Sequence, residues 1–157
     1  MTLVDEYLGA RRDEDRARLR RALALRAMAA GGMSQRQIAE RLGISQPAVS
    51  QQFRSVSRVD GVAPHELLDA AAPVLKALAA EHGYTRLAVF GSVARREARQ
   101  DSDIDLLVEA PVGTSSFEFV AFARLLEEVL GRDVDLVPYG SIQAGHDDDI
   151  LRDAMEL

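Results

Sequence analysis

The chain has 157 residues, of which 47% are hydrophobic and 28% are charged, so it can bury a core and is unlike a disordered polyelectrolyte. It contains no cysteine, which excludes disulfides, thiolate metal sites and cysteine nucleophiles and is typical of a reducing compartment. The first residues lack a basic leader, and no apolar run approaches the roughly 20 residues of a membrane span. We therefore expect a soluble, cytoplasmic protein that makes no contact with membranes.

The net charge of −6 is unevenly distributed along the chain. Residues 1–60 contain 11 arginines and 7 acidic residues, a net charge of +4, whereas residues 61–157 carry −10. A basic segment can approach phosphate, and an acidic segment repels it unless cations intervene. Together with the turn residues that follow Asp60, this asymmetry predicts two domains, residues 1–60 and residues 61–157.

Three helices are predicted in the first domain. Residues 3–30 form one helix or two, ended by Gly31 and Gly32. Ser34 is the expected N-cap of the next helix, which ends at Gly43, where a left-handed backbone is tolerated. Ser45 caps a third helix, which runs to about Phe53 or one turn beyond.

Residues 35–53 resemble a helix-turn-helix of bacterial regulators. Ala39 is small where the second helix of the motif crosses, and Gly43 makes the turn. The other apolar positions are expected to fill a small core: Ile38, Leu42, Ile44 and Val49.

The resemblance implies that the polar positions of the last helix contact DNA. Gln46, Ser50 and Gln51 are expected to be exposed, and glutamine can pair with adenine in the major groove. Phosphate contacts are expected from the flanking arginines Arg36, Arg41, Arg54 and Arg58. A single unit binds weakly, so we expect a dimer, for which the first helix is a candidate contact. The alternative is a helical hairpin used for packing or dimerisation.

The second domain alternates helices and strands. A helix over residues 65–81 contains Pro73, which must kink or split it. Strands are predicted at residues 86–90, 103–109 and 133–137, with a helix at about 117–130 between the last two. The predicted fold class is α+β, an all-α helix-turn-helix domain followed by a small α/β domain with a mixed sheet.

A strand that ends at Gly91-Ser92 offers backbone N–H groups and a hydroxyl where glycine lets a phosphate come close. Asp103 and Asp105 stand two residues apart on a strand, hence on one face, while Ile104 points into the core. Two carboxylates without a neighbouring cation repel each other, and Mg²⁺ relieves that repulsion. A third acid is then expected on the next strand: Asp135, with Asp133 as its competitor.

The arrangement Gly91-Ser92, ten residues, Asp103-x-Asp105 resembles the minimal (MNT-type) nucleotidyltransferases over about residues 84–157. The resemblance implies that Gly91 and Ser92 hold triphosphate and that Asp103 and Asp105 bind Mg²⁺. Asp135 is then the third ligand and the general base. Arg96 departs from the glycine of many relatives, so the loop is expected to be stiffer or to differ in φ. The alternative is a set of surface acids beside a plain turn.

The family resemblance also implies a biological role. Proteins like the second domain act as antitoxins beside HEPN-type ribonuclease toxins and transfer AMP from ATP to a tyrosine of the toxin. The fused DNA-binding domain would then repress the protein's own operon. We therefore expect operator DNA, a cognate toxin and a homodimer or hetero-oligomer as partners. Two alternatives remain: a transferase acting on tRNA or a small molecule, and a regulator whose transferase fold only binds nucleotide or a partner.

Overall fold

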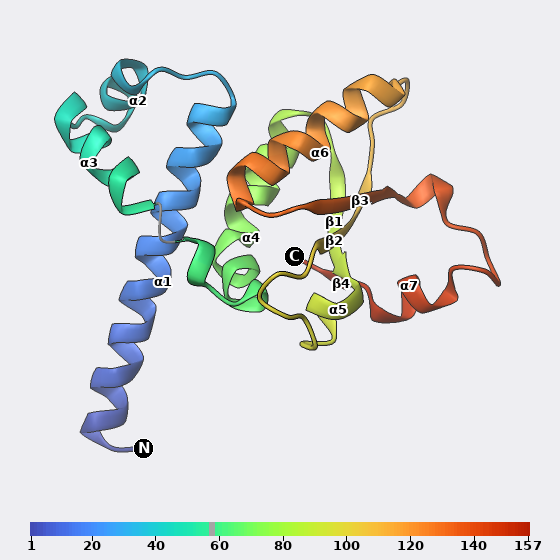
Figure 1. Ribbon diagram of the computed structural model, residues 1–157, viewed down its shortest axis with the longest axis horizontal. Coiled ribbons are helices and arrows are strands. Elements are labelled where there is room, and N and C mark those ends of the chain that lie inside the picture. Colours follow the sequence, from blue (N-terminus) through green and yellow to red (C-terminus); the bar gives the residue numbers. More distant parts are fainter. Residues whose placement is uncertain (57–58) are drawn as a thin grey trace.

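The computed structural model describes residues 1–56 and 59–157 and shows two units on either side of one long helix (Figure 1). The first part of the chain forms α1 (Leu3–Ala30), α2 (Gln35–Leu42), α3 (Gln46–Val56), the short turn η1 (Val59–Gly61) and α4 (Pro64–Glu81). The remainder forms β1 (Thr85–Phe90), α5 (Gly91–Ala94), β2 (Ile104–Glu109), α6 (Ser116–Leu130), β3 (Val134–Pro138), η2 (Tyr139–Ser141), α7 (Asp148–Asp153) and β4 (Met155–Glu156).

The ends of the helices follow the capping residues in the sequence. The Ser34 hydroxyl accepts the Gln37 N–H at 3.1 Å, and the Gln37 side chain accepts the Ser34 N–H at 2.9 Å. Gly43 ends α2 at φ 68°, in the left-handed region. The predicted start and end of α2 are therefore confirmed, as is one continuous helix over α1.

The four strands form a mixed sheet in the order β3-β2-β1-β4. Strand β1 is antiparallel to both β2 and β4, while β2 and β3 are parallel. The predicted fold class is confirmed, but β4 was not predicted, because two residues are too few to carry a periodic pattern. Pro73 lies inside α4 and does not split it.

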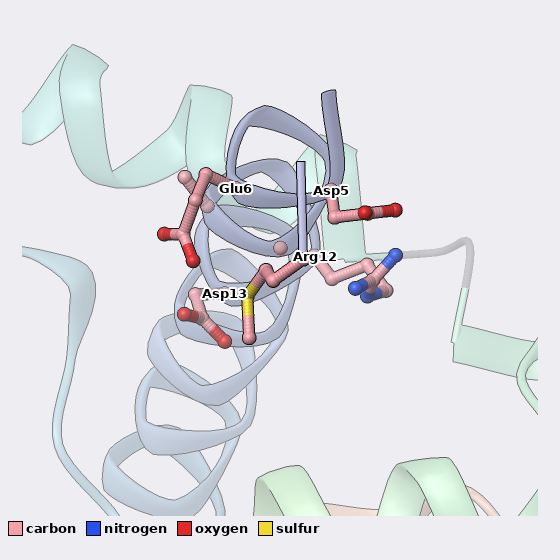
Figure 2. A pocket seen from close by; sticks show the side chains of 7 residues that line it. Asp5, Glu6, Arg12 and Asp13 are labelled. Atoms are coloured by element: carbon pink, nitrogen blue, oxygen red, sulfur yellow. The ribbon is translucent and has the colours of Figure 1, made fainter. Parts of the chain in front are cut away.

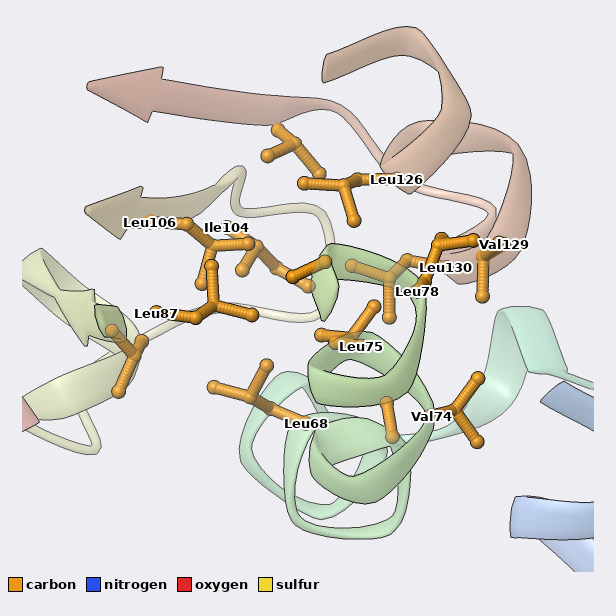
Figure 3. Packing of buried hydrophobic residues seen from close by; sticks show 14 of the residues in the cluster. Leu68, Val74, Leu75, Leu78, Leu87, Ile104, Leu106, Leu126, Val129 and Leu130 are labelled. Atoms are coloured by element: carbon orange, nitrogen blue, oxygen red, sulfur yellow. The ribbon is translucent and has the colours of Figure 1, made fainter. Parts of the chain in front are cut away.

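One face of the sheet packs against α4 and α6 (Figure 3). Leu75 of α4, Leu106 of β2 and Leu126 of α6 are fully buried in this large core. A second, smaller core joins α1, α2 and α3 through Leu25, Ile38, Ala39 and Val49. The predicted roles of Leu42 and Ile44 there are wrong, since these side chains are 47% and 37% exposed. Leu25 of α1 fills the small core in their place.

Helix α1 belongs to both cores. Leu23, which is 0% exposed, enters the large core, and Leu25, which is 2% exposed, enters the small one from another face of the helix. The first turns of α1 extend beyond both units, and Leu3, Val4 and Tyr7 are exposed (Figure 1). The division at residues 60 and 61 stays a prediction. Within the described part of the chain, no helix is both long and apolar enough to cross a membrane.

Replacing Leu23 with alanine should lower the free energy of unfolding by about 3 kcal/mol, because it removes a fully buried side chain between α1 and the large core. Leu3→Ala on the same helix is the matched control and should change stability by less than about 0.5 kcal/mol, since Leu3 is 89% exposed. Urea unfolding measures both. Equal effects would contradict the anchoring role of Leu23.

Candidate functional site

The acidic residues of β2 and β3 lie on the sheet face opposite α4 and α6. Ile104 and Leu106 point into the large core, so Asp105 between them points to the other face. In the parallel register of β2 and β3, Asp105 pairs directly with Asp135. The two carboxylates therefore project side by side, as the spacing of the sequence predicted.

Two further acids lie where these strands begin. Asp103 immediately precedes β2 and Asp133 immediately precedes β3, and both are exposed. The Asp133 carbonyl accepts the Ile104 N–H at 3.0 Å, which continues the parallel ladder by one step. Of the two candidates for the third acid, Asp135 thus lies opposite Asp105 on the neighbouring strand, and Asp133 lies just before that strand, nearer to Asp103.

Burial, and next the negative charges of Asp135 and Asp103, raise the pKa of Asp105 above its usual value. The positive charge of Arg95, a residue that the sequence analysis did not single out, opposes this rise in pKa. Carboxylates that repel one another in this way offer the oxygen ligands that a hard divalent cation prefers. The described residues nevertheless contain no group of three or more acidic or histidine side chains already gathered tightly enough to hold a metal ion.

Gly91 contacts the most buried of these acids. Its φ is 71°, in the left-handed region, and a Cβ at this position would collide with Asp105 Oδ2 and lie 3.2 Å from its Cγ. A side chain at residue 91 would therefore displace the Asp105 carboxylate. Ser92 follows at the start of α5 and is half-buried, so the Gly-Ser pair directly adjoins the acidic face.

Arg96 adopts a φ of 58°, so its backbone has the left-handed conformation that glycine adopts most easily. For a residue with a Cβ, this conformation costs about 1–2 kcal/mol. Arg96 therefore adopts, at this cost, a backbone conformation that glycine adopts easily, and the expectation of a stiffer or different loop stays a prediction.

A hollow of about 300 Å³ adjoins Asp103 and is lined by Gln100, Asp101, Ser102, Asp103, Gly131, Arg132 and Asp133. Another, of about 570 Å³, lies along the exposed half of α1 around Gly9, where Asp5, Glu6, Arg12 and Asp13 surround it (Figure 2). The smaller hollow is the relevant one, because it lies beside the acidic face, whereas the larger is the open side of a single helix.

The residues predicted to contact DNA lie on and beside α3. Gln46 and Gln51 are exposed and Ser50 is half-buried, while Val49 points into the small core. Arg36 at the start of α2 is exposed and pairs with Glu40 at 3.4 Å, and Arg54 is exposed near the end of α3. Arg41 is exposed as well, and Arg58 lies outside the described residues.

Gly91→Ala should destabilise the fold by about 1 kcal/mol or more, because its backbone is left-handed and the new Cβ displaces the Asp105 carboxylate. Gly113→Ala is the matched control, since Gly113 also has a positive φ, 87°, but open space around it. Urea unfolding of both variants measures the difference, and the loss of stability should be larger for Gly91→Ala. Equal destabilisation in the two variants would contradict the role of this close approach.

Comparison with known proteins agrees with this geometry. Residues 73–156 match the family described as nucleotidyltransferase domain, and residues 15–64 match a homeodomain-like domain. Protein adenylyltransferase MntA of Thermococcus cleftensis is 38% identical over 80 residues, which cover 51% of this chain and 81% of that protein. A Methanocaldococcus jannaschii protein, provisionally named a protein adenylyltransferase, is 44% identical over 77 residues, covering 49% of this chain and 83% of its own.

A solved structure, provisionally described as a minimal nucleotidyltransferase, is also similar. It superimposes with a TM-score of 0.54 at 40% sequence identity and covers 59% of this chain and 95% of its own. The chain therefore belongs to the nucleotidyltransferase domain family, as a minimal nucleotidyltransferase that carries a homeodomain-like helix-turn-helix unit in its N-terminal part.

Proposed function

We propose that this protein is a bacterial antitoxin that regulates its own operon. Residues 61–157 transfer AMP from ATP to a tyrosine of a partner toxin, a HEPN-type ribonuclease, and residues 1–60 bind operator DNA. The observation that carries the enzymatic part is the direct pairing of Asp105 with Asp135 on one sheet face, with Gly91 against Asp105. The names of the relatives, protein adenylyltransferases, support AMP as the transferred group.

Asp103, Asp105 and Asp135 are the proposed ligands of Mg²⁺. All three offer carboxylate oxygens, and the pKa of Asp105 is raised first by burial and then by repulsion from Asp135 and Asp103, a repulsion that a cation relieves. When bound, Mg²⁺ neutralises charge on the phosphates and lowers the pKa of an attacking hydroxyl. The three residues fit Mg²⁺ by the chemistry of their oxygen donors and by the register of the two strands. Gly91 and Ser92 are the proposed binding site of the triphosphate.

In the proposed reaction, the acceptor oxygen forms a bond to the α-phosphorus while the bond from that phosphorus to the β-phosphate oxygen breaks. Pyrophosphate leaves, and the proton of the acceptor hydroxyl passes to Asp135. A tyrosine suits this scheme because its pKa of about 10 is well below that of an aliphatic alcohol. Asp135 is exposed on edge strand β3, where a large acceptor can approach it.

The charge of the C-terminal part favours a protein acceptor over RNA. Residues 61–157 carry a net charge of −10, which repels a polyanion and attracts a basic protein surface. A cognate toxin with basic residues around its acceptor tyrosine fits this surface.

Incubation with ATP, Mg²⁺ and the product of the adjacent gene should add one AMP unit to a tyrosine of that product, measured by mass spectrometry. Asp105→Asn should reduce the rate at least about 100-fold, because it removes a proposed metal ligand. Asp69→Asn, an exposed acid of α4, is the control and should keep most of the rate.

Other outcomes of this assay separate the alternatives. Label found only on tRNA would indicate the tRNA-modifying transferase. An unmodified partner that still binds tightly would indicate a non-catalytic binding module, and either result would contradict protein adenylylation.

The DNA-binding part of the proposal depends on α3. Gln46 and Gln51 are exposed on this helix, while Val49 fixes it to the small core, so the helix presents a polar face. Such a face can enter the major groove, with Arg36 and Arg54 positioned to contact phosphates. Because one reading helix covers a short site, we propose a dimer, or a hetero-oligomer with the toxin, on a two-fold operator.

The double variant Gln46→Ala, Gln51→Ala should lose about 10-fold or more in affinity for the promoter region of its own gene, while its salt-dependent binding to unrelated DNA is kept. A mobility-shift assay with both DNAs measures this. Gln100→Ala in the C-terminal part, which is also exposed, serves as the control. A double variant that prefers promoter DNA over unrelated DNA as strongly as the wild type does would contradict the assignment of α3 as the helix that reads the DNA sequence.

A further inference from the structure

The N-terminal half of α1 extends away from the rest of the described chain (Figure 1). None of residues 3–16 belongs to either core of the described residues, and all of them are exposed except Gly9, which is half-buried. A helical segment of this length without tertiary contacts is marginal in water. Yet the helix begins here with a complete capping box between Thr2 and Asp5. Packing against a partner would supply the stabilisation that the single chain does not.

The apolar side chains of this half gather on one face of the helix. Leu3, Val4 and Tyr7 are spaced by three and four residues, and Val4 and Tyr7 are 66% and 70% exposed. Tyr7 comes 18 residues before Leu25, which is about five full turns, so the two side chains face the same way. The face that α2 and α3 cover at Leu25 therefore continues along α1 as an exposed apolar face.

The same face carries charges of both signs. At spacings of three and four residues after Tyr7 it presents Arg11, Glu14, Arg18 and Arg21, all of them exposed. Within the helix, Arg18 Nη2 lies 3.6 Å from Glu14 Oε1. A basic position and an acidic position thus follow one another near the middle of the segment, and such a face is complementary to its own copy when the copy runs in the opposite direction.

We propose that a second copy of this chain packs antiparallel on this face of α1, with the two-fold axis between residues 12 and 13. In that register Arg11 lies opposite Glu14 of the partner subunit, and the reverse pair forms by symmetry. Tyr7 lies opposite Arg18 of the partner subunit, where a guanidinium can stack on the ring. A parallel copy would instead place Arg11 against Arg11 and Glu14 against Glu14, which is repulsive.

This inference rests on the proposed function, which requires a dimer on a two-fold operator. In the proposed register the two copies of Leu25 lie about 38 Å apart along the helix axis, since each residue rises about 1.5 Å. Leu25 belongs to the small core that also holds Val49 of α3. Half-sites read by two such helices are about 34–36 Å apart, one turn of DNA. The pairing therefore separates the two small cores by about the distance between half-sites.

The test is sedimentation velocity of the full chain, without DNA, over a range of concentrations. The double variant Val4→Asp, Tyr7→Asp should raise the dissociation constant of the dimer about 10-fold or more, because it replaces apolar contacts with charge. Val112→Asp, Phe117→Asp is the matched control, since these side chains are also apolar and exposed but lie before and within α6. A control that dissociates the dimer as strongly would overturn the proposal. Thermal unfolding checks that each variant keeps its fold.

Charge reversal tests the register. Arg11→Glu and Glu14→Arg should each weaken the dimer about 5-fold or more, because each variant alone places like charges opposite one another. An equimolar mixture of the two variants should associate more tightly than either does alone, since every opposed pair then has opposite signs. A mixture that associates no better than the single variants would overturn the antiparallel register. So would single variants that associate like the wild type, as a parallel pair would.

Failure of this inference is distinguishable from failure of the proposed function. A wild-type chain that is monomeric at every concentration, yet prefers promoter DNA through α3, would overturn the α1 dimer alone. A monomeric chain that binds the toxin through Val4 and Tyr7 would also overturn it, since the toxin would then occupy this face. A dimer that the α1 variants dissociate, in a protein without preference for promoter DNA, would support this inference and overturn the DNA-binding part of the proposed function.

Discussion

The architecture depends on one helix that is buried on two faces. Leu23 and Leu25 of α1 lie two residues apart, and each is a fully buried member of a different core. The same helix is attached to the end of α6, where Arg26 Nη2 donates to the Glu128 carbonyl at 2.9 Å. Positive charge at the last turn of a helix interacts favourably with the helix dipole. This contact therefore adds an electrostatic attraction to the apolar packing of α1.

The turn after the helix-turn-helix is attached to the α/β unit by another arginine. The Arg132 guanidinium donates to the Val62 carbonyl, just before α4, and to the Gln100 carbonyl, in the loop that leads to Asp103. The same guanidinium therefore joins the segment before α4 to the loop before β2.

The sequence predicted those features that depend on neighbouring residues. The side-chain alternation of β2 and β3 placed Asp105 and Asp135 on one face, and serine and glycine located the ends of α2. The features it missed depend on distant pairing. Strand β4 exists only because β1 offers an edge, and the contact of Arg95 with Asp153 joins residues 58 positions apart. Leu42 and Ile44 stay exposed because α1, from outside the motif, fills the small core.

The layers of the molecule follow one another in a fixed order: α2 and α3, then α1, then α4 and α6, then the sheet, and finally α7 (Figure 1). The polar face of α3 and the acidic face of the sheet therefore lie at opposite ends of this stack. Macromolecules bound at the two ends would approach this chain from opposite sides. A ternary assembly is thus open to this chain, with α1, which belongs to both cores, as the element between its two ligands.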